Sequence, residues 1–368
     1  MRKAIMILLI LTLPLTGVFA QDFSFEEMKE AFKDFAEGAA DALPMTSTVG
    51  LQWSTAYIGQ FPHLGFGPSV GFGTIPLFYF RNVFDMFNID DKALIDQLPP
   101  QVPVELLGVP FPAYSIDFRL GGFGLIFKRA DLGFKIGFIP YIPGKFDIKE
   151  LTGMNIDYFM AGGDIRVNLV KQTFWLPHIS VGGGYNFIRG GFAIPGLLGS
   201  NIHITDFKVP VESSIKTEEI TYETSTLELQ DPSLAFRWQT HMIDLKAQIS
   251  KKILLLFTPY IGAGASFALS KAGGGMYTEI LKDGKPLTEE EKDELNRLFK
   301  EAQQIDKTQQ FPDLTADGII VQSGAPGFMF RAFGGLSINL WVLKTDISLM
   351  YNILGKSLGA NVNIRLQF

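Results

Sequence analysis

The amino-acid sequence predicts an all-β fold, namely a transmembrane antiparallel β-barrel of about 12 strands, within a range of about 10–14. The chain is 47% hydrophobic, with 33 Phe and 38 Gly. After residue 20, however, it has no apolar run of the roughly 18 residues that a spanning helix needs. Short segments alternate between apolar and polar residues, and long and short connections alternate between them. Because lipid cannot hydrogen-bond an open backbone, a closed barrel is the fold that remains.

Residues 1–20 predict a cleaved signal peptide. Arg2 and Lys3 precede an apolar run that Pro14 interrupts, and the segment ends in the small residue Ala20. An uncleaved membrane anchor is the alternative. The chain has no Cys, which excludes a lipid-anchored lipoprotein, disulfides and thiolate metal sites. Without the signal, 30 basic residues remain against 38 acidic ones, so we expect no nucleic-acid partner.

An amphipathic helix is expected within residues 21–45, before the first strand. Ser24 and Glu27 have the spacing of a capping box at its start. The apolar stripe includes the plug candidates Met28, Phe32 and Phe35. The opposite face is charged, so the helix can contact both an apolar patch and a wet, charge-lined lumen. It would then plug the barrel, and a helix packed beneath the barrel is the alternative.

Residues 46–368 are assigned to the barrel as a single domain. Alternation marks strand candidates at 46–59, 64–76, 113–127, 131–141, 155–170, 177–190, 233–249, 252–269, 326–343, 344–353 and 359–368. In one of them the apolar parity changes, because Phe236 and Trp238 share one parity and Ile243 the other. We expect a bulge near Met242 to return these residues to one face.

The connections alternate in length along the chain. Those at 128–131, 171–174, 250–252 and 342–344 are short, and those at 77–112, 191–231 and 271–326 are long. Short turns at one rim and long loops at the other are typical of bacterial outer-membrane barrels. A further strand is expected within 191–231. In the longest, extracellular loop, Thr288 and Glu291 form a capping box for a second helix.

Charged residues on the polar faces are the best candidates for lining the lumen, because an Arg or Lys that faces lipid at mid-membrane costs about 2–4 kcal/mol. The candidates are Asp117, Arg119, Asp164, Arg166, Arg237, Asp244, Lys246, Arg331, Asp346 and Arg365. Both signs occur, whereas an ion-selective constriction favours one sign. Structural pairing across strands and contact with a substrate are the two interpretations.

The last strand separates its two faces completely. Its apolar residues are Val362, Ile364, Leu366 and Phe368, and polar residues stand between them. The whole mature chain resembles a bacterial outer-membrane β-barrel protein, and the terminal Phe resembles the sorting signal read by the barrel-assembly machinery. The resemblance implies a location in the bacterial cell outer membrane, with outer-membrane lipid and that machinery as partners. It implies no particular cargo.

Two narrower resemblances concern the early helix and the glycine-rich strands. The segment "PVELLGVPFPAYSIDFRLGGFGLIFKRADLGFKIGFIP" resembles uncharacterised families of barrels without known activity. The Phe-rich segment before the barrel is similar to that of long-chain fatty-acid transporters, in which it plugs the lumen. No motif secures this second resemblance, so no ligand-binding residue is transferred.

The sequence therefore predicts a passive channel or transporter for small or hydrophobic solutes. The alternative is a structural or adhesin-like barrel that presents its loops 191–231 and 271–326 to partners. An enzyme is not expected, because no nucleophile or metal site has an oriented partner. The histidines His63, His178, His203 and His241 are scattered, and no catalytic residue, metal or cofactor is predicted.

Overall fold

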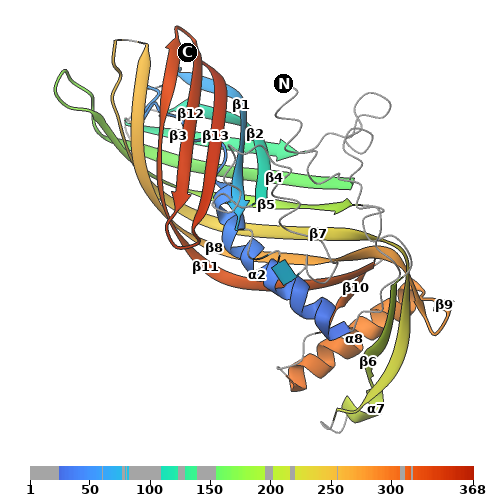
Figure 1. Cartoon of the computed structure of the whole chain (residues 1–368). Helices are drawn as coiled ribbons and strands as arrows, with labels where there is room; N and C mark the ends of the chain where they lie inside the picture. The colour runs from blue at the N-terminus through green and yellow to red at the C-terminus, as the bar shows by residue number, and fades with distance from the viewer. Residues whose placement is uncertain are drawn as a thin grey trace, which may run out of the picture.

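The computed structural model shows a closed barrel that continues into an elongated extension (Figure 1). It describes residues 25–59, 61–76, 79, 81–82, 109–122, 129–138, 155–194, 202–215, 220–254, 256–306, 311–315 and 318–368. The expected signal peptide and Ser24 lie outside these ranges, as does the side chain of Met28.

The barrel is a ring of antiparallel strands, so the predicted fold class is confirmed. In ring order the strands are β1 (Leu64–Ile75), β2 (Val109–Gly121), β3 (Ala130–Phe138), β4 (Asn155–Val170), β5 (His178–Ile194), β7 (Tyr222–Ser250), β8 (Phe257–Lys282), β11 (Gly318–Leu340), β12 (Leu343–Asn352) and β13 (Ser357–Gln367). The ring closes because β13 pairs with β1 and β8 pairs with β11. The described ranges thus contain ten ring strands, at the lower end of the expected range.

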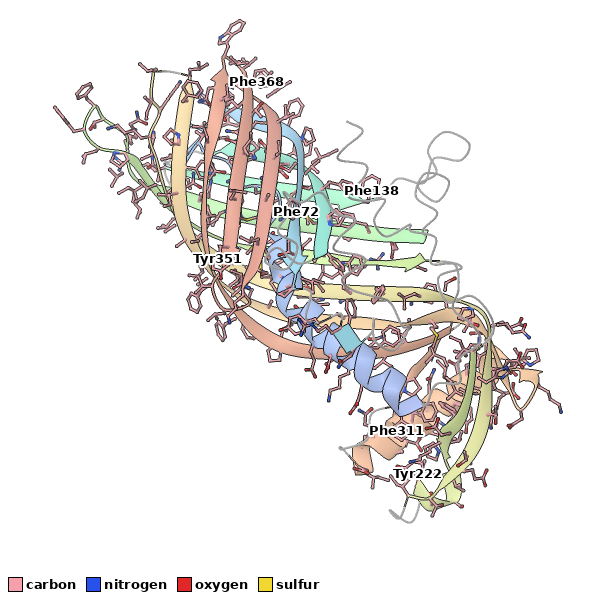
Figure 2. The ribbon with its side chains drawn as sticks, viewed as in Figure 1. Phe72, Phe138, Tyr222, Phe311, Tyr351 and Phe368 are labelled. Carbon is pink, nitrogen blue, oxygen red and sulfur yellow. The ribbon has the colours of Figure 1, made fainter. Side chains whose placement is uncertain are left out.

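The alternation of the sequence determines which side chains face outward. On β13, Val362 and Ile364 are exposed, whereas Asn361, Asn363 and Arg365 are buried inside. Leu366 lies on the outward side of the same strand, and the terminal Phe368 is exposed. Phe138 and Tyr351 likewise point away from the wall (Figure 2). The outer face is therefore apolar and the inner face polar, as the period of two requires.

The two rims differ. The short-turn rim carries the turns at 171–177, 251–256 and 341–342, and β13 also ends there. At the opposite, long-loop rim, β7, β8 and β11 run on beyond the ring for total lengths of 29, 26 and 23 residues. Ranges 191–231 and 271–326, expected as long loops, thus contain the continuations of β7, β8 and β11 beyond the ring, because alternation continues into them.

Shorter elements cover this extension. They are β6 (Ile202–Pro210), α7 (Glu212–Ile215), β9 (Lys285–Pro286), α8 (Glu289–Ile305) and β10 (Asp313–Thr315). The strand expected within 191–231 is β6, which pairs with β7 outside the ring. The second helix is confirmed as α8, with the predicted reciprocal capping box between Thr288 and Glu291. No helix in the described ranges is long and apolar enough to cross a membrane.

Two expectations about strands are wrong. Residues 46–59 form the end of helix α2 (Phe25–Ser47) and then an irregular segment, in which Gly50 and Leu51 have positive φ. There is also no bulge near Met242, because β7 pairs without interruption from Ser233 to Ser250. The parity of β7 does not change. What changes along it is the chemistry of the barrel interior.

Candidate functional site: a barrel interior filled by the N-terminal segment

The interior of the barrel has an apolar half and a charged half, and both appear in one row of inward side chains. Along β7 this row reads Phe236, Trp238, Thr240, Met242, Asp244, Lys246, Gln248 and Ser250. The apolar half lies toward the long-loop rim and the charged half toward the short-turn rim. The apparent change of parity in the sequence marks this boundary. On the side of the long-loop rim the apolar side chains of β7 face inward, and on the side of the short-turn rim they face outward.

Helix α2 fills the apolar half. Phe32 and Phe35 are fully buried, and the ring of Phe35 meets that of Phe236 edge-on at 4.4 Å between centroids. Ala36, Ala39 and Leu43 continue the same buried face. The wall makes room at Gly274, where an added Cβ would lie 2.3 Å from the Phe32 ring. The helix satisfies its own backbone hydrogen bonds, so this part of the wall can be apolar.

Methionines surround the chain where it passes from one half to the other. Met45, Met242, Met329 and Met350 belong to one buried cluster. The side chains of Thr48 and Gln52 donate hydrogen bonds to the Met350 sulfur, at 3.4 and 3.0 Å. Thioether side chains are flexible and fill irregular gaps. This methionine collar can therefore seal around a helix end, a turn or a solute.

Helix α2 ends at this collar. The hydroxyls of Ser47 and Thr48 donate to the carbonyls of Pro44 and Met45 at 2.8 and 2.7 Å, which closes the last turn. The positive φ of Gly50 and Leu51 then turns the chain into the charged half. We call residues 48–59 the luminal segment.

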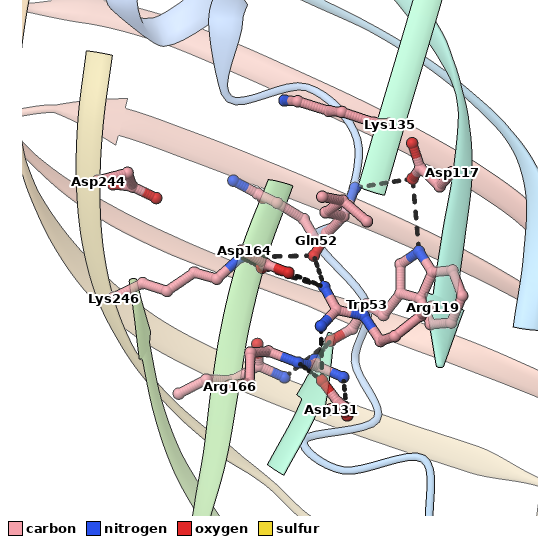
Figure 3. A network of polar contacts seen from close by, with 12 residues as sticks. Gln52, Trp53, Asp117, Arg119, Asp131, Lys135, Asp164, Arg166, Asp244 and Lys246 are labelled. Carbon is pink, nitrogen blue, oxygen red and sulfur yellow. Dashed lines mark hydrogen bonds and ion pairs between the residues drawn. The ribbon is translucent and has the colours of Figure 1, made fainter. Parts of the chain in front are cut away.

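A network of buried ion pairs surrounds the luminal segment (Figure 3). The Arg119 guanidinium bonds Asp131 at 2.6 Å and Asp164 at 2.8 Å. Arg166 shares Asp131, at 2.8 Å, and Lys246 shares Asp164, at 2.7 Å. These residues come from β2, β3, β4 and β7, so the network ties four strands across the lumen.

Aspartates of the wall accept hydrogen bonds from backbone N–H groups of the luminal segment. The N–H of Leu51 donates to Asp117 at 2.7 Å, and that of Ile58 donates to Asp131 at 3.1 Å. Ser54 N–H donates to Asp346 at 3.3 Å. The luminal segment forms neither helix nor strand, so its backbone N–H groups have no regular backbone partners, and these carboxylates accept their hydrogen bonds instead.

Cationic and amide side chains of the wall donate hydrogen bonds to backbone carbonyls of the N-terminal segment. Lys135 Nζ donates to the carbonyl of Val49 and to that of Ser47, the last residue of α2, each at 2.6 Å. Gln248 Nε2 donates to the Ser54 carbonyl at 2.8 Å. An extended peptide needs both donors and acceptors from its surroundings. That need explains why charges of both signs line this half.

Trp53 is the largest buried side chain of the luminal segment. Two guanidinium groups lie over its ring, that of Arg119 at 5.4 Å and that of Arg365 at 4.4 Å from the ring centre. The indole N–H donates to Asp117 at 3.4 Å. An added Cβ at Gly65 would lie 2.8 Å from the same ring. The charged half is therefore packed with protein at this level.

The structure places most of the predicted lumen residues on inward faces. These are Asp117, Arg119, Asp164, Arg166, Asp244, Lys246, Arg331, Asp346 and Arg365, and the last two form an ion pair, as do Arg331 and Asp244. Arg237 is the exception. It lies on the outer face, over the ring of Tyr277, because β7 runs without the expected bulge. The inward residues form ion pairs with one another across the lumen, and contact with a substrate stays a prediction.

Sequence reasoning missed three residues that hold the luminal segment. Asp131 and Lys135 lie on the inward parity of "ADLGFKIGF", opposite Leu132, Phe134, Ile136 and Phe138, and this alternation could have identified them. Trp53 carried no such signal, because its segment forms no strand. Within the described ranges, no group of three or more His, Asp or Glu side chains is arranged to hold a metal ion.

Comparisons with known proteins return only distant structural similarity. No family model matches the chain, and no curated protein matches its sequence. The chain is similar to the toluene transporter TbuX of Ralstonia pickettii, with 9% identity over 94% of this chain and 97% of that chain, and a TM-score of 0.22.

Two further solved structures give comparable values. The CymD monoaromatic hydrocarbon channel has 8% identity over 86% of this chain and 90% of that one, with a TM-score of 0.25. A FadL homologue of Pseudomonas aeruginosa has 8% identity over 90% and 97%, with a TM-score of 0.21. TM-scores this low carry no structural argument, and the description of the barrel rests on its own strand pairing.

Proposed function

We propose that this protein is an outer-membrane barrel that provides a gated, passive route for small apolar solutes. The observation that carries the proposal is the division of one interior into an apolar half and a charged half, each filled by a different part of the same N-terminal segment. The apolar half offers apolar solutes an environment that water does not. The charged half closes the route toward the short-turn rim until the luminal segment moves.

The outer wall supports the membrane part of the proposal. Exposed apolar side chains cover the outside of the barrel, for example Val70, Ile116, Phe134 and Ile347, at 48–60% exposure. No second sheet packs on them in the described ranges. Contiguous apolar surface of this kind marks a lipid or protein contact. We expect the protein to need detergent for solubility, and a soluble monomer without detergent would contradict the proposal.

The adhesin-like alternative gains no support from the structure. It assigns ranges 191–231 and 271–326 to external partners. Much of both ranges forms β6, β7, β8, α8 and β11. Phe207 of β6 and Phe299 of α8 belong to the same apolar cluster as Phe32 and Phe35 of α2. These segments therefore cover the apolar half instead of standing free as binding loops.

A cysteine tether tests the gate. The chain has no Cys, and a Cβ added at Gly73 would lie 2.6 Å from the Thr46 side-chain oxygen. Thr46→Cys with Gly73→Cys should therefore form a reversible disulfide between α2 and β1. In cells that carry the variant in their outer membrane, we expect oxidation to lower the uptake of a labelled alkylbenzene to the level of cells without the protein, and a reductant to restore it.

Each single-cysteine variant is the matched control for oxidation. Equal uptake before and after complete oxidation of the pair would overturn the gate. Uptake that never exceeds that of cells without the protein would overturn the proposed route itself.

A further inference from the structure

We propose that the outer face of β5, β7 and β8 carries a binding site for the phosphate group of a membrane lipid. The inference goes beyond the solute route, because it concerns the opposite face of the wall. It rests on the membrane placement proposed above and on the order of outward residues along these strands.

Successive outward rows locate the end of the apolar band. One row consists of Gly163, Tyr185, Ile243, Phe267 and Phe328, which are paired directly across β4, β5, β7, β8 and β11. The next row toward the long-loop rim is Ala161, Phe187, His241, Leu269 and Pro326. Ile243 is 61% exposed and Leu269 is 53% exposed, so both rows present apolar surface.

The row that follows is cationic. Arg189 of β5 pairs with Gln239 of β7, which pairs with Lys271 of β8. All three are exposed. Neighbouring strands lie about 4.8 Å apart, so the two cations flank one amide across about 10 Å. A phosphate at the boundary between acyl chains and water can contact all three side chains.

The glutamine in the middle of the row is held in place from the apolar side. Its amide Nε2 lies 2.8 Å from His241 Nε2, and His241 Nδ1 lies 2.6 Å from the Tyr185 hydroxyl. This chain of polar contacts rises from the apolar band to the cationic row. It orients Gln239, whose side chain would otherwise rotate freely at an exposed position.

Aromatic rings position the arginine side chains. The Arg189 guanidinium lies over the Phe159 ring at 5.6 Å, and that of Arg237, one row further on, lies over the Tyr277 ring at 4.9 Å. Stacking on Phe159 leaves the edge donors of Arg189 available for a bidentate oxygen ligand, whereas Arg237 Nε also donates to the Tyr277 hydroxyl. Arg237 faces Gly191 on one side and Gly273 on the other, which leaves the surface shallow beside it.

The charge balance favours an anion. No ion pair joins Arg189 or Lys271 to a carboxylate among the described residues. The nearest outward acid in the register is Asp157, which pairs with Gly191 one row beyond. Cations at the edge of an apolar band match a lipid that carries its phosphate at the same depth. We therefore commit to a lipid headgroup over a freely dissolved phosphate.

The test measures lipid retained by the purified full-length barrel in a mild detergent. The probes are phosphatidic acid, phosphatidylcholine and inorganic phosphate, and the variant is Arg189→Gln with Lys271→Gln. Lys251→Gln with Lys252→Gln, at the opposite rim, is the matched control with the same loss of charge. We expect wild type and control to retain phosphatidic acid, and the first variant to bind it about 25-fold more weakly, at about a fivefold effect for each cation.

Several outcomes would overturn the site. Equal retention of phosphatidic acid by both double variants would remove the role of the cationic row. Retention of phosphatidylcholine as strong as that of phosphatidic acid would show that the cationic row does not select an anionic headgroup, and equally strong binding of inorganic phosphate would refute the lipid source. Alkylbenzene uptake measured on the same variants separates this site from the solute route, because the site can fail while uptake persists.

Discussion

The apolar and charged halves of the interior are built by the same strands, yet they contact the N-terminal segment differently. One half packs on it, and the other forms hydrogen bonds and ion pairs around it. In the apolar half, Phe236 and Trp238 of β7 are part of the surface that meets the apolar face of helix α2. In the charged half, Asp244, Lys246 and Gln248 of the same strand face an extended peptide. The change occurs within about four residues, at the methionine collar.

The difference shows that the wall matches the backbone of its contents. A helix satisfies its own N–H and C=O groups, so only packing is required of the strands around α2. The luminal segment has no such ladder, and every buried backbone group needs a partner from the wall. Mixed charges in a lumen can therefore indicate an enclosed peptide, in addition to the pairing of strands.

Removal of each part of the N-terminal segment is the strongest test of this comparison. Deletion of residues 22–43 removes α2 up to Leu43 but leaves the luminal segment bound, so we expect ion conductance in planar bilayers to stay near the wild-type level. Deletion of residues 22–59 removes both, and conductance should rise by about tenfold or more, because a ring of ten strands is wider than its own side chains fill.

Circular dichroism and heat-modifiable migration on gels should show a folded barrel for both deletions. Conductance that stays at the wild-type level in a folded 22–59 deletion would show that the luminal segment is not the seal.

Asp117→Asn should loosen the luminal segment specifically. The carboxylate accepts hydrogen bonds from the Leu51 N–H and from the Ser69 hydroxyl, at 2.7 and 2.6 Å. Loss of bonds to a buried charged acceptor costs about 1–3 kcal/mol, which would raise the open population by about five- to 150-fold. A cysteine at the buried Ala56 reports this opening through its rate of maleimide labelling.

Asp157→Asn, in the same reporter background, is the matched control, because Asp157 is an exposed aspartate on the outer face of β4. An unchanged labelling rate in Asp117→Asn would mean that this carboxylate does not hold the segment.

Gly274→Ala should disturb the apolar half alone. The new methyl group would lie 2.3 Å from the Phe32 ring, and overpacking of this kind typically costs about 1–3 kcal/mol. We expect faster proteolysis of α2 with unchanged labelling at position 56. Phe32→Ala in the same chain should restore part of the protection, because it removes the clash.

The matched control is Gly334→Ala, where the nearest atom is 3.4 Å from the added Cβ. Equal proteolysis of the two glycine variants, or faster labelling at position 56 in Gly274→Ala, would contradict independent packing of the two halves.

Thr288→Ala should have the smallest effect, because it concerns only the cover of the apolar half. The substitution removes the side-chain acceptor for the Glu291 N–H at the start of α8. We expect faster amide exchange in the first turn of α8, with no change in conductance or labelling. Measurable loss of the seal in this variant would show that the cover and the charged half are coupled.

The same capping box makes α8 sensitive to acid. Hydrogen bonds from the Thr288 backbone and side chain lower the pKa of Glu291 below its ordinary value. This contribution is therefore present above the ordinary pKa and is lost as the pH falls through the lowered one. Protection of the first turn should decrease in that acidic range in the wild type, and Glu291→Gln should remove this pH dependence.

The sequence by itself determined the wall. Strict alternation, as in Val362 and Ile364 opposite Asn361 and Asn363, predicts a strand with one apolar and one polar face, because side chains on a strand have a period of two. The same local rule located the inward Asp117 and Arg119, and the capping box located α8. These features depend on spacing within a few residues, which a single sequence displays directly.

Only the tertiary structure decided what fills the barrel. The sequence of residues 46–59 alternates enough to suggest a strand, and nothing local indicates that its N–H and C=O groups bond to Asp117, Lys135 and Gln248. The orientation of Arg237 was decided in the same way. The same parity of β7 faces inward along the whole strand, while the interior changes from apolar to charged. The polarity of Arg237 alone therefore predicted the wrong face for it. Both outcomes depend on residues that are distant in the chain and meet only when the ring closes.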